Sequence, residues 1–133
     1  MKQMRYLFDT HALVFWSSQV GVSAAFIQFF DQENQRGALY VSSISFWEIA
    51  LLVQKKRLAI PDVQLWQTEL LQRTNLQLLE PTVSEMIAST LLPLHHKDPF
   101  DRLLIVQAQR HALSLVTQDE LIPQYAVATH WVP

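Results

Sequence analysis

Cysteine is absent from this chain of 133 residues, and glycine occurs only at Gly21 and Gly37. The absence of cysteine excludes disulfide bonds, zinc-thiolate centres and thiol nucleophiles, and it fits a reducing cytoplasm. Two isolated glycines cannot form a Walker phosphate loop or a dinucleotide-binding fingerprint. The sequence therefore predicts a protein that binds no nucleotide through a glycine-rich loop.

Charge is also scarce, because only 17% of the residues are charged and the net charge is −2. Such a chain has no overall cationic field, so binding to nucleic acid would depend on local basic clusters or on a metal ion. Apolar runs are short, and Asp9 interrupts the first of them before it could serve as the core of a signal peptide. We expect a soluble protein with no membrane partner.

Hydrophobic residues make up 50% of the chain, which is ample for a packed core at this length. We find no repeat, low-complexity tract or linker, and we predict a single domain over residues 1–133. Short apolar runs predict buried strands of a parallel sheet. These runs are Tyr6 to Phe8, Leu39 to Val41, Leu76 to Leu79 and Leu115 to Val116, with a further short edge strand at Ala126 to Ala128.

Segments with helical periodicity lie between these runs. Their apolar positions are Phe26, Ile27 and Phe30; Phe46, Ile49, Ala50 and Val53; Val63, Trp66 and Leu70; and Leu104, Ile105 and Ala108. Residues typical of helix ends agree: Ser23 as a cap, Gly37 as a terminator, a capping box at 82–85, and Asp98 before Pro99. The alternation predicts an α/β sandwich, with a central, mainly parallel sheet flanked by helices.

Four acidic residues, Asp9, Glu48, Asp101 and Asp119, lie in otherwise apolar segments. Carboxylates are rarely buried without partners. Two like charges about 4 Å apart repel by roughly 4 kcal/mol at an effective dielectric near 20. Acids that converge on one pocket therefore need a cation or altered protonation, and a divalent metal is the economical answer.

Three of these acids also have ordinary structural explanations. Asp9 could cap a helix that begins near Thr10. Glu48 follows Ser45 by three residues, as in a capping box, and Asp119 could be a cap or turn residue after its strand. Asp9 and Asp119 nevertheless directly follow strands, where ligands bind in open α/β sheets. In a right-handed parallel layout, all four acids would gather at one edge.

Asp101 is the most informative acid, because Leu104, Ile105 and Ala108 follow it at the spacing of an inward helical stripe. It is therefore expected to point toward the sheet, with a salt bridge to an arginine or lysine as the structural alternative. Asp98 lies one turn earlier, and helix capping explains it adequately.

Histidines and basic residues give weaker signals. The pair His95 and His96 precedes the Asp98 cap and is placed to reach a phosphate or a metal. It lacks the spacing of a helical ligand pair, so a solvated loop is the favoured interpretation. The run from Lys55 to Arg57 ends a predicted helix, where favourable interaction with the helix dipole explains it better than phosphate binding does.

The segments LFDTHALVFW, VSSISFWEIALLVQKKRL, HHKDPFDRLLIVQAQ and LVTQDE together resemble the PIN-domain ribonucleases, and specifically the VapC-type toxins of bacterial toxin–antitoxin pairs. The resemblance runs over essentially the whole chain. By that similarity, Asp9, Glu48, Asp101 and Asp119 match the family's acidic quartet. The positions with a supporting role are Thr10, Ser43, Asp98 and Thr117.

The resemblance implies a three-layer PIN-like sandwich, a homodimer, Mg²⁺ or Mn²⁺ at the acidic cluster, and a small antitoxin that covers the active site. The reaction it implies is hydrolysis of an RNA phosphodiester, with Asp9 and Asp101 as the principal metal ligands and Glu48 and Asp119 positioning metal or water. Asp119 is also counted among the metal-binding residues. Any of the four carboxylates remains a candidate general base.

Two other functions are compatible with parts of this pattern. A catalytically inert PIN-like protein-binding module would use its acids only as caps and ion pairs. Phosphoryl transfer through an aspartyl phosphate also begins with an aspartate after a first strand, but the sequence Asp9-Thr10-His11 lacks the second acid two residues on.

Overall fold

A five-stranded, entirely parallel sheet with the strand order β3-β2-β1-β4-β5 forms the centre of the structure, a computed structural model that describes residues 3–133. The mainly parallel sheet predicted from sequence is thus confirmed. Its strands are β1 (Tyr6–Phe8), β2 (Leu39–Ser42), β3 (Gln77–Leu79), β4 (Ser114–Val116) and β5 (Thr129–His130).

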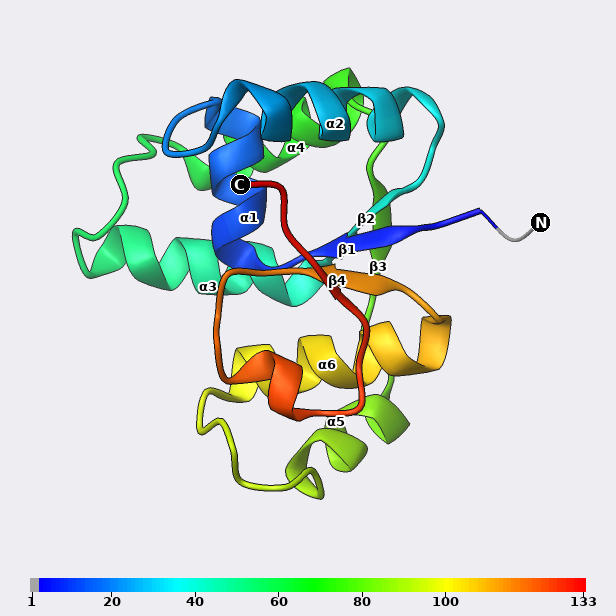
Figure 1. The fold of residues 1–133 in the computed structure, drawn as a ribbon. Coiled ribbons are helices and arrows are strands. Elements are labelled where there is room, and N and C mark those ends of the chain that lie inside the picture. Colours follow the sequence, from blue (N-terminus) through cyan, green and yellow to red (C-terminus); the bar gives the residue numbers. More distant parts are fainter. Residues whose placement is uncertain (1–2) are drawn as a thin grey trace.

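Within residues 3–133, six α-helices flank the sheet and form the outer layers of the sandwich (Figure 1). They are α1 (Thr10–Ser18), α2 (Ala24–Gln35), α3 (Ser43–Gln54), α4 (Val63–Arg73), α5 (Val83–Thr90) and α6 (Pro99–His111), with a 3₁₀ turn at Ile122–Gln124. Helices α1, α2 and α4 cover one face, and α5 and α6 cover the other. No helix within residues 3–133 is long and apolar enough to cross a membrane.

Two hydrophobic clusters hold these layers together. Phe8, Phe26 and Phe30 are fully buried between the sheet and the first group of helices. Leu7 and Leu104 belong to the cluster on the opposite face, under α6. Because β1 is the central strand, its side chains alternate between the two clusters. The continuous burial of β1 agrees with the apolar run read from the sequence.

The predicted helix boundaries are confirmed at four ends. Ser23 caps α2, and Gly37, with a φ of 72°, follows its last turn. Thr82 and Glu85 form the reciprocal capping box of α5. Asp98 caps α6, whose first residue is Pro99. These local signals were readable because each depends on contacts within one helical turn.

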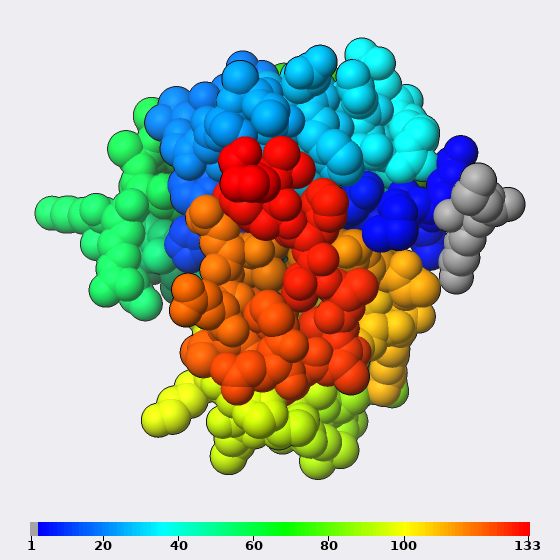
Figure 2. All heavy atoms as spheres, in the orientation of Figure 1, coloured from blue at the N-terminus to red at the C-terminus, as the bar shows by residue number. Residues whose placement is uncertain are grey.

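The edge strand predicted at 126–128 was misplaced, because β5 is formed by Thr129 and His130 and pairs with β4. The 3₁₀ turn and the bend that follows it occupy the preceding residues, and the Tyr125 hydroxyl is anchored to the Pro93 carbonyl at 2.6 Å. Figure 2 shows the C-terminal residues on the surface beside α2, where the Pro133 carbonyl accepts a hydrogen bond from Ser23.

Candidate metal centre

Five carboxylates line one pocket of about 420 Å³ at the carboxyl edge of the sheet. Asp9 directly follows β1, and Asp119 lies three residues after the end of β4. The other three come from helices that begin at this edge. They are Glu48 in α3, Asp98 at the N-cap of α6 and Asp101 in the first turn of α6. The structure therefore brings the whole predicted quartet together.

Asp9 both caps a helix and lines the pocket. Its Oδ1 accepts a hydrogen bond of 2.8 Å from the Ala12 N–H at the start of α1. Burial raises the pKa of this carboxyl, while hydrogen bonds from the Thr117 side chain and the Ala12 backbone oppose that rise. The capping explanation and the pocket location hold together, because one oxygen suffices for the cap.

Glu48 has a different role from the predicted capping box, which was wrong. Helix α3 begins at Ser43 with Ser42 as its N-cap, so Ser45 and Glu48 lie inside the helix. The buried Thr10 hydroxyl lies within hydrogen-bond distance of the Glu48 carboxylate and of the Ser45 hydroxyl. Burial raises the Glu48 pKa, the Thr10 hydrogen bond lowers it, and nearby Asp98 raises it again.

Ser43 was predicted to lie near the site, but it is not among the residues that line the pocket. The serine that contacts the site network is Ser45, two residues later, through Thr10. The sequence signal was the spacing of Ser45 and Glu48, which places both on one helical face. Thr117 does take part, because its hydroxyl also accepts a hydrogen bond from the Asp119 N–H at 3.0 Å.

Asp101 carries a strongly perturbed carboxyl in the same pocket. Burial, followed by the charges of Asp98, Asp9, Glu48 and Asp119, raises its pKa to about 8. The alternative salt bridge to an arginine or lysine was wrong, because within residues 3–133 the basic side chain that contacts the Asp101 carboxyl is His96, with Nε2 3.1 Å from Oδ2. A pKa of about 8 favours the protonated form of Asp101 at neutral pH.

His96 lies in the site, although the sequence interpretation favoured a solvated loop over contact with a phosphate or metal. Its Nε2 lies 2.7 Å from Asp119 Oδ2 and 3.1 Å from Asp101 Oδ2, so it bridges two acids of the quartet. Its Nδ1 accepts a hydrogen bond from the Asp98 N–H, which places the proton of a neutral ring on Nε2. The solvated-loop prediction holds for the exposed His95 and was wrong for His96.

Asp119 is the more exposed of the two acids that contact His96. Burial raises its pKa, but hydrogen bonds from the Leu121 N–H and from His96 outweigh burial, and the net pKa is lowered. The pocket thus combines one carboxyl whose pKa is lowered, at its rim, with more buried carboxyls whose pKa is raised. Groups held in such contrasting states are typical of functional sites.

The pocket's donor set fits a hard divalent cation. Its acids supply carboxylate oxygens, and His96, Asp101 and Asp119 each offer one ligand atom within 4.8 Å of the others. A cation would relieve the repulsion that raises the Asp101 pKa. Oxygen-rich sites favour Mg²⁺, Mn²⁺ or Ca²⁺ over softer metals. With its proton on Nε2, His96 serves better to orient Asp101 and Asp119 than to ligate.

The sequence model of the PIN domain family matches residues 6–128, so this chain belongs to the PIN domain family. The match covers every element that supplies a carboxylate to the pocket. A search of curated proteins gave no significant match. The family assignment agrees with the strand order and with the acids at the carboxyl edge of the sheet.

Solved structures with the same fold include proteins of toxin–antitoxin systems. A chain of VapBC2 from Rickettsia felis, bound to a promoter DNA fragment, aligns with a TM-score of 0.71 and 15% identity over 96% of this chain and 98% of that chain. PAE2754 from Pyrobaculum aerophilum aligns with a TM-score of 0.62 and 19% identity, over 94% of this chain and 87% of that chain. A chain of a toxin–antitoxin complex from Klebsiella pneumoniae aligns with a TM-score of 0.57 and 18% identity, over 86% of each chain.

Proposed function

We propose that this protein is a metal-dependent endoribonuclease that acts as the toxin of a toxin–antitoxin pair. The observation that carries the proposal is the convergence of five carboxylates on one pocket of a PIN domain, with the Asp101 pKa raised to about 8. PIN domains are typically nucleases, and oxygen ligands suit Mg²⁺ or Mn²⁺. The proposed catalytic residues are Asp9, Glu48, Asp101 and Asp119, with Thr10, Asp98 and Thr117 in support.

Each residue of the pocket has a proposed task. Asp9, Asp101 and Asp119 would hold the cation, which, when bound, lowers the pKa of water and neutralises charge on the phosphodiester. Thr10 fixes the Glu48 carboxylate, and Thr117 supports both Asp9 and the Asp119 backbone. His96 keeps Asp101 and Asp119 oriented. The chain thereby aligns a phosphodiester with an attacking water.

The proposed partner is a small antitoxin protein. The structures from Rickettsia felis and Klebsiella pneumoniae contain toxin–antitoxin assemblies, and this chain shares their fold along most of its length. An antitoxin segment that covers the pocket would keep RNA from the carboxylates. We place this activity in the cytoplasm, where RNA is the available substrate.

We further propose that the protein is a homodimer formed through α5. Helix α5 and the loop after it expose a contiguous set of large apolar side chains, a feature that marks interaction surfaces. Its members, with exposed fractions from 45% to 83%, are Val83, Met86, Ile87, Leu91 and Leu94. A second copy would bury this surface by self-complementary packing.

Replacing Ile87 with glutamate is expected to convert the dimer to a monomer, because a buried carboxylate in an apolar interface is unfavourable. Light scattering coupled to size-exclusion chromatography measures the mass directly. Leu65→Glu on α4 is the matched control, since Leu65 is similarly exposed on the opposite face of the sheet. A dimeric Ile87→Glu variant, or a monomeric wild type, would contradict the proposed interface.

The test of the ribonuclease proposal is cleavage of a pool of structured cellular RNAs by purified protein, with Mn²⁺ and with a chelator. Discrete fragments are expected with Mn²⁺ only. Binding of Mn²⁺ should also raise the melting temperature, since a ligand that binds only the folded state stabilises it. A protein that Mn²⁺ neither activates nor stabilises would instead be the inert binding module, in which the acids serve as caps and ion pairs.

A further inference from the structure

A second groove, of about 370 Å³, adjoins the carboxylate pocket, and Glu48 and Asp98 line both. Three cations, Lys55, Arg57 and Lys97, line the new groove. The shared residues make the two hollows neighbours, so one extended chain can lie across both. The groove therefore extends the candidate site in a direction where the charge changes from negative to positive.

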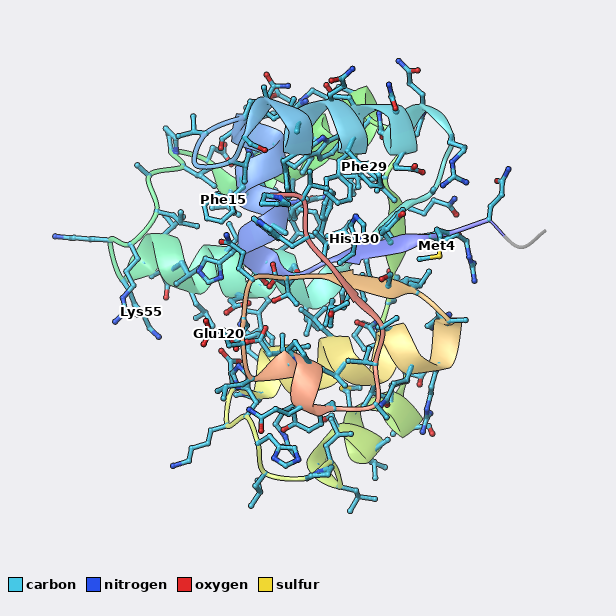
Figure 3. The ribbon with its side chains drawn as sticks, in the orientation of Figure 1. Met4, Phe15, Phe29, Lys55, Glu120 and His130 are labelled. Carbon is cyan, nitrogen blue, oxygen red and sulfur yellow. The ribbon has the colours of Figure 1, made fainter. Side chains whose placement is uncertain are left out.

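The three cations are exposed, and none forms an ion pair within residues 3–133. The helix dipole of α3 accounts for Lys55 at its C-cap, as the sequence interpretation held. It cannot account for Lys97, which directly precedes the N-cap of α6, where a positive charge is unfavourable. Figure 3 shows Lys55 at the end of α3. Because Lys97 comes from the loop before α6, two separate segments supply positive charge to one groove.

An exposed aromatic ring, Trp47, lies beside the groove against one of its lining residues. The side chain of Trp47 is 63% exposed, which is unusual for so large an apolar group. Its ring packs edge to face against the Phe100 ring, with 5.2 Å between the ring centroids. Phe100 lines the groove with Pro99. Cations that follow a backbone, together with exposed aromatic rings on which bases stack, are the usual combination in sites for single-stranded nucleic acid.

We propose that this groove binds the single-stranded RNA next to the scissile phosphodiester, with Lys55, Arg57 and Lys97 on its phosphates and Trp47 stacked on a base. The inference rests on the proposed ribonuclease function and names the path of its substrate. It also explains how a chain with a net charge of −2 binds RNA, because the necessary cations are gathered beside the carboxylates.

The experiment compares two triple variants that change the net charge equally. The groove variant carries Lys55→Ser, Arg57→Ser and Lys97→Ser. The control variant carries Lys56→Ser, Arg73→Ser and Arg110→Ser, none of which lines the groove. Binding of a fluorescent single-stranded RNA is measured by anisotropy in chelator at several salt concentrations, and cleavage kinetics are measured in Mn²⁺.

The groove variant should lose about tenfold or more in RNA affinity, and the slope of log K against log salt should decrease by about 2, since each phosphate contact to a single strand contributes about 0.7. Its kcat/KM should fall mainly through KM. Trp47→Ala should weaken binding about tenfold, with recovery in Trp47→Phe, because stacking contributes roughly 1–3 kcal/mol per base.

Equal losses in the two triple variants would overturn the inference, because net charge alone would then explain them. A groove variant that binds RNA normally but loses affinity for polyglutamate would overturn it in favour of an acidic protein segment. In either case wild-type protein that still cleaves RNA leaves the ribonuclease proposal intact. Wild-type protein that does not cleave RNA would refute both.

Discussion

Replacing Asp101 with asparagine is expected to reduce metal-dependent RNA cleavage at least 100-fold while making the metal-free protein more stable. The two effects have one cause. Asp101 lies among Asp98, Asp9, Glu48 and Asp119, whose charges, together with burial, oppose its ionisation. At neutral pH the folded protein without a cation must hold a proton on Asp101 that the unfolded chain has lost, which lowers stability. Asparagine needs no such proton, so the substitution removes this cost and also removes the carboxylate that is proposed to hold the cation.

The pH dependence of stability provides the sharpest readout of this change. The Asp101 pKa of about 8 is far above the ordinary value of 3.8, so between these pH values the folded state holds a proton that the unfolded state has lost. Stability of the metal-free protein should therefore fall as pH rises from about 4 to 8, by at most about 1.4 kcal/mol per pH unit from this group. Asp101→Asn should flatten that slope.

Urea unfolding at pH 5.5 and pH 7.5, with and without Mn²⁺, measures both consequences. Mn²⁺ should restore wild-type stability at pH 7.5 and should have much less effect on Asp101→Asn. Asp62→Asn is a suitable control, because Asp62 is an exposed helix cap on α4, outside the carboxylate pocket. If Asp101→Asn kept wild-type cleavage, or if its stability fell with pH as steeply as that of the wild type, the assigned role of Asp101 would be wrong.

The position of Asp101 could be predicted from the sequence because the stripe of Leu104, Ile105 and Ala108 fixes which side of α6 is buried. Asp9 and Asp119 were predicted to lie at the carboxyl edge for a similar reason, since each closely follows a short apolar strand. Parallel topology then brings these positions together. These inferences use only period and order along the chain.

His96 could not be placed in this way, because no periodic element contains it. Its ring reaches Asp119 only because the loop before α6 is held by distant groups, among them the Tyr125 hydroxyl, which accepts a hydrogen bond from the His96 N–H at 2.8 Å. Glu48 was located correctly but explained wrongly. Its partner is Thr10, 38 residues away, and such a pairing has no local signature.

The groove beside the carboxylate pocket illustrates the same distinction. The basic run at the end of α3 was visible in the sequence, and the helix dipole was a sufficient explanation for it there. Lys97 changes the interpretation because the fold brings it from the loop before α6 to the same groove. No periodic pattern places Lys97, so its position beside the end of α3 could not be predicted from the sequence.

Replacing Arg102 with alanine is expected to destabilise the protein by roughly 3 kcal/mol, because the variant leaves three part-buried carbonyls without their donor. Arg102 is only 6% exposed, although it carries a full charge. Its guanidinium donates to the carbonyls of Leu92, Pro93 and His96 at 2.9 to 3.1 Å. No carboxylate within residues 3–133 pairs with it, so the three backbone carbonyls, together with the Tyr125 hydroxyl at 3.5 Å, compensate its burial.

Arg102 therefore links stability to the candidate metal centre through the loop at 91–98. The planar fork of arginine reaches three carbonyls at once, whereas lysine offers one point charge, so Arg102→Lys should recover only part of the loss. Urea unfolding gives the stability, and Mn²⁺ titration calorimetry gives the affinity. Both should fall in Arg102→Ala, because His96 would no longer be held against Asp101 and Asp119.

Arg110→Ala separates this effect from the general loss of an arginine on α6. Arg110 is exposed, and among the residues that the structure describes its guanidinium donates only to the Ser84 hydroxyl, at 2.8 Å. Its removal should therefore change stability by less than about 1 kcal/mol and leave Mn²⁺ affinity unaltered. If Arg102→Ala lost stability but bound Mn²⁺ as tightly as the wild type, the loop would matter only for folding. Loss of both would establish that this buried arginine holds His96, and through it two of the carboxylates, in the arrangement that the metal requires.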